Sequence, residues 1–372
     1  MKNKPIMKAL CFILIIYTIF VTIGVGVSAE DIKLTSINYV DDECLPALAD
    51  GVQVGSRFLD LFFGKEEKSA EGTNLLVGGQ VFGMKIRQKY VTIVESRGIP
   101  ALKSGDVILS VDGEKVSTTS DVRQAVEKSK GKSMTIRALH QGNEIAVEIR
   151  PSMEDGEYRL GLTLRDSAAG LGTVTFIDPK TGAFGGLGHG ICDSDTGEVI
   201  PMSGGDICGV ILGGIHKGES GKPGELCGVL TDTDLGDLKI NSECGVFGVL
   251  ADIPSSSSQS LPIGRRDEVV EGEATIVSTL KNGHTAEYKV RIYNIDQTSE
   301  GSKSFRIRVT DESLKAVSGG IVRGMSGSPI IQNGKLVGAV THVLVADPME
   351  GYGIFIENML NAAGITELKK AA

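Results

Sequence analysis

Short runs of alternating apolar and polar residues fill most of the chain after residue 74, and turn residues separate them. In SFRIRVTD, the apolar side chains of Phe305, Ile307 and Val309 fall at every second position, which is the period of a half-buried β-strand. Two apolar runs flank Asn333-Gly334, a dipeptide typical of tight β-hairpins. Because short strands with regularly spaced turns favour a closed β architecture, we expect a mainly β protein.

Two segments have a helical pattern instead. In TTSDVRQAVEKSKG, the apolar residues Val122 and Val126 lie on one face of a predicted helix. Ser120 or Asp121 is expected to cap the N-terminus of this helix, and Gly131 is expected to end it. The stretch IENMLNAAGI near the C-terminus predicts a second, short helix.

The segment 74–165 resembles a PDZ domain of mixed α and β structure. Its stretch GIPALKSGDVILSVDGEKV is close to the bacterial PDZ pattern, in which a helix start leads to a strand and a turn. The resemblance implies that an open strand edge accepts an extended peptide and that loop amides hold its terminal carboxylate. It places this peptide-binding loop at Val81, Phe82, Gly83 and Met84.

The N-terminus carries the pattern of an export segment. Lysines at positions 2, 4 and 8 precede the uncharged stretch 9–29, which is longer than a typical signal core of roughly 7–15 residues. We therefore expect residues 1–29 to be a signal peptide or a transmembrane anchor. Residues 30–73 contain a charged run and are expected to form a linker. In either case the rest of the chain is expected outside the cytoplasm.

Charge and cysteine content narrow the classes of partner. The formal net charge is −9, and no Lys/Arg-rich run is present, so a nucleic-acid partner is not expected. Six cysteines occur without a close C-x-x-C pair, which favours neither a zinc site nor a full disulfide framework. We expect no metal and no organic cofactor.

The stretch GMSGSP predicts a nucleophilic serine. Gly324 and Gly327 permit a tight bend around Ser326, in which the N–H groups of Gly324 and Ser326 form an oxyanion hole. The stretch resembles the nucleophile loop of chymotrypsin-like serine peptidases, including the apolar hairpin that follows it. Ser328 is the rival serine, but it directly precedes a proline, and Ser326 matches the family position.

Five histidines are available as the base that activates this serine. His189 is favoured because it follows a predicted strand and lies far enough upstream to belong to the other half of a double barrel. His216 is second, and His342 is expected to line the substrate groove. The acid that orients the histidine is left open by spacing alone, and the candidates are Asp232, Asp234 and Asp311. Each of these carboxylates is also a plausible turn former or helix cap.

The chain as a whole resembles the SpoIVB peptidase family, whose members carry an export segment, a PDZ domain and a chymotrypsin-like serine peptidase domain. The resemblance is strongest over 159–193, which includes GTVTFIDPKTGAFGGLGHGI, and over 303–361, which includes the GMSGSP loop. It implies a double β-barrel peptidase domain over residues 166–372. It also implies that the catalytic residues are His189, Asp311 and Ser326, and so it selects Asp311 as the acid. The stretch 203–228 and the cysteines outside the export segment are not part of the family pattern.

The resemblance further implies a biological role. Members of the family act in endospore-forming bacteria, where they are exported from the forespore into the space between its two membranes. The implied substrates are the peptidase itself and a membrane-bound regulatory complex of an intramembrane protease, which then activates a sigma factor. The implied role of the PDZ domain is to bind substrates and the peptidase itself. The alternative is a catalytically silent PDZ scaffold that regulates another protease.

Overall fold

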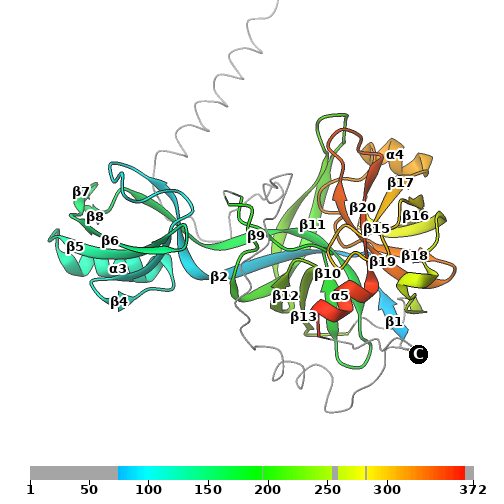
Figure 1. Ribbon diagram of the computed structural model, residues 1–372, viewed down its shortest axis with the longest axis horizontal. Helices are drawn as coiled ribbons and strands as arrows, with labels where there is room; N and C mark the ends of the chain where they lie inside the picture. The colour runs from blue at the N-terminus through cyan, green and yellow to red at the C-terminus, as the bar shows by residue number, and fades with distance from the viewer. Residues whose placement is uncertain (1–73, 195, 254–258, 281–282, 365–372) are drawn as a thin grey trace, which may run out of the picture. The chain divides into compact units, whose positions relative to one another are not determined.

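The computed structural model describes residues 74–194, 196–253, 259–280 and 283–364 (Figure 1). The expected signal peptide or anchor at 1–29 and the expected linker at 30–73 lie outside these residues. Among the described residues, no helix combines the length and the apolar character needed to cross a membrane.

The first barrel is a ring of antiparallel strands. Strand β2 pairs with β9 on one side and with β11 on the other, and this double pairing closes the ring in the order β2-β9-β10-β13-β12-β11. Phe82, Met84, Phe184 and Val246 are among the buried residues at its centre. The strands are β2 (Val81–Ser96), β9 (Leu162–Ile177), β10 (Ala183–Gly186), β11 (Met202–His216), β12 (Glu225–Ser242) and β13 (Gly245–Leu250).

The second barrel is closed in the order β15-β16-β17-β20-β19-β18. The alternation predicted for SFRIRVTD is confirmed, because Phe305, Ile307 and Val309 are all buried in the core of this barrel. The turn predicted at Asn333-Gly334 is also confirmed, with φ values of 51° and 73° that join β18 to β19. The strands are β15 (Gly272–Thr279), β16 (Thr285–Tyr293), β17 (Phe305–Val309), β18 (Pro329–Gln332), β19 (Lys335–Val343) and β20 (Glu350–Phe355).

A third core lies in residues 91–165, which we call the inserted unit because they interrupt the first barrel between the two halves of the β2–β9 pair. The barrel part of β2 pairs with β9 from Val81 to Arg87, and pairing resumes at Thr92 with Arg165. Buried residues from this unit include Ile93 and Ile136. Its elements are the far ends of β2 and β9 with β3 (Val107–Val111), β4 (Glu114–Lys115), α3 (Thr119–Ser129), β5 (Met134–His140), β6 (Asn143–Ile149), β7 (Ser152–Glu154) and β8 (Glu157–Arg159).

The strand pairing corrects two boundaries expected from the sequence. The stretch Val81–Met84 is not a peptide-binding loop of the PDZ segment, since it lies inside β2 and pairs with both β9 and β11. Phe82 and Met84 are buried in the core of the first barrel, so a peptide cannot reach them there. The peptidase part therefore starts before the inserted unit, at β1 (Asn74–Val77), which pairs with β9. The stretch 203–228, which is foreign to the family pattern, forms most of β11 and the start of β12.

The cap of helix α3 also differs from the expectation. Thr118 is the N-cap, rather than Ser120 or Asp121, and its hydroxyl accepts a hydrogen bond from the backbone N–H of Asp121. The Asp121 carboxylate accepts the N–H of Thr118 in return, which completes a capping box. The helix ends at Lys130 in the left-handed conformation, one residue before Gly131. The sequence pattern located the helix but placed its first residue too late.

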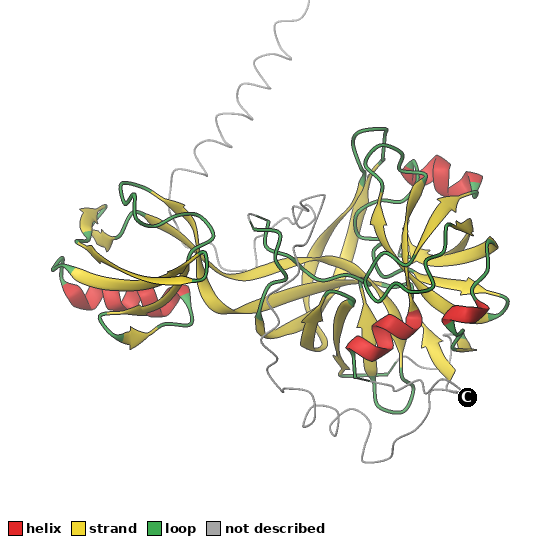
Figure 2. Ribbon diagram, viewed as in Figure 1, coloured by secondary structure: helices red, strands yellow, loops and turns green. Residues whose placement is uncertain are grey.

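Helices are few and peripheral. Among the described residues, the α-helices are α3, α4 (Glu312–Ser318) and α5 (Ile356–Ala362), and Figure 2 shows that strands joined by loops form the bulk of the structure. The short helix predicted at IENMLNAAGI is confirmed as α5. Its residues Ile356, Met359 and Leu360 are buried together with side chains from both barrels.

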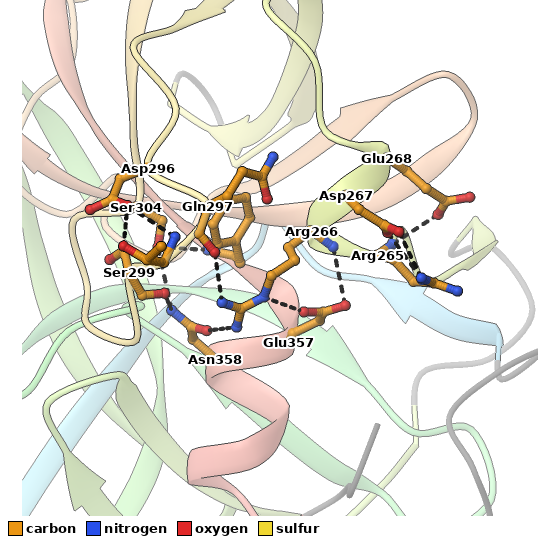
Figure 3. A network of polar contacts seen from close by, with 12 residues as sticks. Arg265, Arg266, Asp267, Glu268, Asp296, Gln297, Ser299, Ser304, Glu357 and Asn358 are labelled. Carbon is orange, nitrogen blue, oxygen red and sulfur yellow. Dashed lines mark hydrogen bonds and ion pairs between the residues drawn. The ribbon is translucent and has the colours of Figure 1, made fainter. Parts of the chain in front are cut away.

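Arg266 lies in the segment that leads from the first barrel to β15, and its side chain joins this segment to helix α5 (Figure 3). It lies in the 3₁₀ turn η2 (Arg266–Glu268), and its guanidinium donates to the carboxylate of Glu357 at 2.7 Å and to the side chain of Asn358 at 2.8 Å. It also donates to the carbonyl of Gln297 at 3.1 Å and lies 5.4 Å from the ring centroid of Phe355. Glu357 is only 7% exposed, and within the described residues the charge that compensates its carboxylate is that of Arg266.

We predict that Arg266→Ala lowers the free energy of unfolding by roughly 3 kcal/mol, because it leaves the Glu357 carboxylate buried without its counter-charge. The matched control is Lys335→Ala, which removes the exposed ion pair with Glu268 of the same 3₁₀ turn and should cost less than about 1 kcal/mol. Urea denaturation of the two variants measures the difference. Equal losses would contradict the assignment of Arg266 as the buried connection.

Candidate active site

The segment 322–328, which we call the nucleophile loop, joins α4 to β18 and carries both candidate serines. Ser326 is partly exposed, whereas Ser328 is fully buried, and the Ser328 hydroxyl has no hydrogen-bond partner among the described residues. A substrate carbonyl can therefore approach Ser326 and not Ser328. The Ser326 hydroxyl donates to the carbonyl of Thr341 at 2.7 Å.

Hydrogen bonds hold the nucleophile loop by its carbonyl oxygens. Strand β9 supplies three of the donors: the Thr173 hydroxyl to Gly324 at 2.8 Å, the Thr173 N–H to Ser326 at 2.9 Å, and the Thr175 hydroxyl to Gly327 at 2.7 Å. Thr173 and Thr175 are both fully buried. The first barrel thus fixes the conformation of a loop that belongs to the second.

Two further carbonyls of the loop accept backbone hydrogen bonds. The carbonyl of Arg323 accepts the N–H of Leu226 at 2.9 Å, and the carbonyl of Met325 accepts the N–H of Ser328 at 2.9 Å. In a planar trans peptide the N–H points opposite to the C=O. These two bonds therefore fix the directions of the N–H groups on the same peptides, which belong to Gly324 and Ser326.

The amides of Gly324 and Ser326 differ from their neighbours. Within the described residues neither donates a hydrogen bond, although Arg323, Met325 and Gly327 donate to backbone carbonyls at 2.7–3.1 Å. Backbone N–H groups in proteins are nearly always paired. Two unused donors, two residues apart and next to an accessible hydroxyl, are arranged for an oxygen atom that is brought by a ligand.

Glycine is required at position 327 for steric reasons. Gly327 has φ +95°, and a Cβ there would lie 1.9 Å from the carbonyl oxygen of Thr173. Gly324 also has φ +95°, and its Cβ would lie 3.0 Å from the side chain of Leu226. The close approach of strand β9 thus explains Gly327, and the positive φ together with Leu226 of β12 explains Gly324.

His189 lies in the turn after β10 and is 8% exposed. Its Nδ1 is 2.8 Å from the carbonyl oxygen of Gly190. Because a carbonyl can only accept, Nδ1 carries the proton in this bond, and the Nε2 of a neutral ring keeps its lone pair. Burial lowers the pKa of His189, so the ring stays neutral even at pH values below the usual pKa of histidine. This is the tautomer and charge state that a general base needs.

The His189 loop lies against strand β19. The rings of His189 and His342 have centroids 4.9 Å apart, and a Cβ on Gly188 would lie 2.9 Å from the Thr341 side chain. The carbonyl of Thr341 also accepts the hydroxyl of Ser326. Strand β19 therefore contacts Ser326 through Thr341 and His189 through His342. Burial, with the neighbouring His189 and Lys303, lowers the pKa of His342 to about 2. His342, expected in the substrate groove, is a neutral neighbour of the candidate base.

The expected acid lies at the N-terminus of helix α4. Asp311 is the N-cap of α4, and its carboxylate accepts the backbone N–H groups of Ser313, Leu314 and Lys289 at 2.9–3.1 Å. These bonds and that of the Ser313 hydroxyl lower the pKa of Asp311 against the opposing effect of burial. In the described part of the chain no hydrogen bond or ion pair joins Asp311 to His189. The structure thus shows Asp311 as a helix cap, and the catalytic role implied by resemblance stays a prediction.

The other candidates from the sequence do not replace Asp311. Asp232 and Asp234 lie on strand β12, where an oxygen of Asp234 accepts the N–H of Gly236 at 3.0 Å. Within the described residues neither contacts His189. His216, the second choice for the base, pairs instead with Glu225 at 3.0 Å. Among the described residues, His189 forms a hydrogen bond with the Gly190 carbonyl, which no side-chain pattern can reveal.

The solved structures that resemble this chain do so at low sequence identity and low TM-score. The chain is 14% identical to the Rv3671c protease of M. tuberculosis in its active form, over 54% of this chain and 76% of that one, with a TM-score of 0.30. The PDZ domain of the SdrC-like protein Lmo2051 from Listeria monocytogenes is 20% identical over 21% of this chain and 90% of that one, with a TM-score of 0.20.

Sequence comparisons are more specific. A provisionally named zinc metalloprotease, LL2128 of Lactococcus lactis subsp. lactis strain IL1403, is 32% identical over 92 residues, which are 24% of this chain and only 20% of that protein. The family model described as SpoIVB peptidase S55 matches residues 156–360, more than half of the chain. This span contains the His189 turn, strand β9 and the nucleophile loop. The chain belongs to the SpoIVB peptidase S55 family and is a serine peptidase.

Proposed function

We propose that the protein is an exported serine endopeptidase that cleaves itself and a membrane-associated regulatory protein during endospore formation. The observation that carries the catalytic part is the pair of unused amides at Gly324 and Ser326 beside an accessible hydroxyl. Family membership supports the biological setting. The expected export segment supports action outside the cytoplasm.

In this proposal Ser326 attacks the scissile carbonyl. His189 takes the hydroxyl proton at Nε2 as attack proceeds and then donates it to the leaving amine. The negative oxygen of the tetrahedral intermediate accepts hydrogen bonds from the N–H groups of Gly324 and Ser326. The acyl-enzyme is hydrolysed by water through the same groups. No metal or organic cofactor enters these steps.

The resting hydrogen bond of Ser326 sets a condition for catalysis. The hydroxyl donates to the Thr341 carbonyl at 2.7 Å, so it must rotate about χ1 before it can donate to His189. Such catalytic hydrogen bonds often form only when substrate is bound. A peptide in the site would therefore promote attack by displacing the hydroxyl from Thr341.

The Gly190 carbonyl replaces the usual acid in orienting His189. It accepts from Nδ1 at 2.8 Å and stabilises the imidazolium that forms during attack. A carbonyl dipole is a weaker stabiliser than a carboxylate, so the enzyme is expected to be slow. Slow turnover suits a peptidase with one regulatory cleavage to make.

The inserted unit is proposed to be the PDZ domain that binds the substrate or a second copy of the enzyme. Its sequence resemblance supports this role. Because Val81–Met84 lies within the first barrel, the peptide-binding residues must come from elsewhere in the unit. A silent PDZ scaffold is the rival reading, and the unused amides of the nucleophile loop argue against it.

Incubation of the purified full chain tests catalysis. We predict fragments that accumulate with time in the wild type and are absent in Ser326→Ala and His189→Ala. The matched control is Ser328→Ala, which removes a buried hydroxyl two residues away and should still cleave. Asp311→Asn should also cleave, because asparagine caps a helix about as well as aspartate.

Each result of this incubation separates two accounts. Fragments in Ser326→Ala would contradict the assigned nucleophile. A folded but inactive Asp311→Asn would contradict the helix-cap assignment and restore the carboxylate to the catalytic set. No fragments from any chain, with or without an added peptide library, would favour the silent scaffold.

Thr173→Val tests how strand β9 supports the nucleophile loop. Valine keeps the shape of the side chain but cannot donate to the Gly324 carbonyl, so we predict a loss of about 1–3 kcal/mol of stability. The kcat for peptide cleavage should fall by about tenfold with little change in KM, which is less than the loss of an oxyanion donor itself. Thr175→Val is the matched control: its stability loss should be similar, but its kcat loss smaller. Equal kcat values in the two variants would contradict the proposed role of Thr173.

A further inference from the structure

Three side chains with metal-binding atoms meet where strands β11 and β12 join, outside the candidate active site. His216 is the last residue of β11 and pairs directly with Glu225, the first residue of β12. Cys227 lies two residues after Glu225 and so projects from the same face of the strand. Register alone therefore brings an imidazole, a carboxylate and a thiol to one side of the hairpin.

The distances between these groups are close to those between the ligands of one metal ion. The Nδ1 of His216 is 3.0 Å from an oxygen of Glu225 and 3.5 Å from the sulfur of Cys227. All three atoms lie within 4.8 Å of one another. A tetrahedral zinc with ligands at about 2.0–2.3 Å places those ligand atoms roughly 3.3–3.8 Å apart. The distance from the His216 nitrogen to the Cys227 sulfur already lies in this range, and the distance from this nitrogen to the Glu225 oxygen is a few tenths of an ångström below it.

We propose that His216, Glu225 and Cys227 bind a Zn²⁺ ion that controls the nucleophile loop. Nitrogen, oxygen and thiolate sulfur are the donor set that zinc prefers. The His216 side chain is 68% exposed, so an ion can enter from solvent and a water can complete the tetrahedron. A salt bridge between His216 and Glu225 would not account for the thiol beside them.

The site is coupled to the oxyanion amides through one residue. Leu226 lies between the ligands Glu225 and Cys227, and its N–H donates to the carbonyl of Arg323 at 2.9 Å. That bond fixes the peptide whose N–H belongs to Gly324. In addition, the carbonyl of Gly224 accepts the Arg323 N–H at 2.8 Å.

Metal binding would thus rigidify the strand segment 225–227. The Leu226 N–H of this segment fixes the direction of the Gly324 amide through its bond to the Arg323 carbonyl. Loss of the ion would let this segment shift and the Arg323–Gly324 peptide rotate. The active site would then lose one of its two oxyanion donors without any change in Ser326 or His189. This makes the metal site a switch for catalysis rather than a second catalytic centre.

Cobalt titration tests the binding site directly. The full chain carrying Ser326→Ala prevents self-cleavage, and Co²⁺ serves as a probe because thiolate ligation gives a near-ultraviolet charge-transfer band. We expect one Co²⁺ per chain, a band of this kind, and displacement by Zn²⁺. Cys227→Ser should abolish the band, and His216→Ala should weaken binding at least tenfold. The matched control is Cys244→Ser, another partly exposed free cysteine, which should leave both unchanged.

Two results would overturn the proposal. The site is wrong if Co²⁺ produces no thiolate band in a chain whose circular dichroism is native, or if the band survives Cys227→Ser. The switch is wrong if Zn²⁺ binds but does not change the kcat of the wild-type chain on a peptide substrate. The first readout does not depend on the proposed peptidase activity, so failure of one can be told from failure of the other.

Discussion

The directions of two peptide bonds, Arg323–Gly324 and Met325–Ser326, are the constraint on which the rest of the site depends. Their carbonyls accept the N–H groups of Leu226 and Ser328, so their own N–H groups point the other way and donate to no group in the described part of the chain. Catalysis of acyl transfer needs such donors in place before charge develops, because reorganisation during the reaction would raise the barrier. The fold can be understood as the means of holding these two peptides.

Both barrels contribute to that task. The loop belongs to the second barrel by sequence, but strand β9 of the first barrel holds it. The Thr173 hydroxyl binds the carbonyl of the one peptide between the two critical ones, and the Thr173 N–H and the Thr175 hydroxyl bind the two carbonyls that follow. Strand β12 of the first barrel supplies Leu226. The close approach of β9 leaves no room for a side chain at position 327, which accounts for one of the conspicuous glycines. The hairpin of β11 and β12 then offers a route by which a bound ion can act on the loop.

Local patterns in the sequence predicted much of this structure. Alternation located the strand of Phe305 to Val309, and a turn dipeptide located the β18–β19 hairpin, because both depend on neighbours in the chain. The glycines around Ser326 indicated a bend with an oxyanion hole. The likeness to a known family indicated the peptidase class, which the family comparison then showed.

Features set by long-range pairing were not predictable in the same way. Strand β2 serves the first barrel with one end and the inserted unit with the other, so Val81–Met84 looked like the start of the insertion. Asp311 fits an acid by resemblance and a cap by its position before α4, and only the contacts separate the two roles. The Gly190 carbonyl has no sequence signal because every residue carries one.

The most direct test of the central claim is a crystal structure of the protein after reaction with a serine-directed peptidyl phosphonate. The account predicts a covalent bond to Ser326 Oγ, with a phosphonyl oxygen about 2.7–3.1 Å from the amide nitrogens of both Gly324 and Ser326. It also predicts that the Leu226 N–H still donates to the Arg323 carbonyl in the adduct. A phosphonyl oxygen turned away from both amides, or an adduct that forms only after the Arg323–Gly324 peptide has flipped, would contradict it.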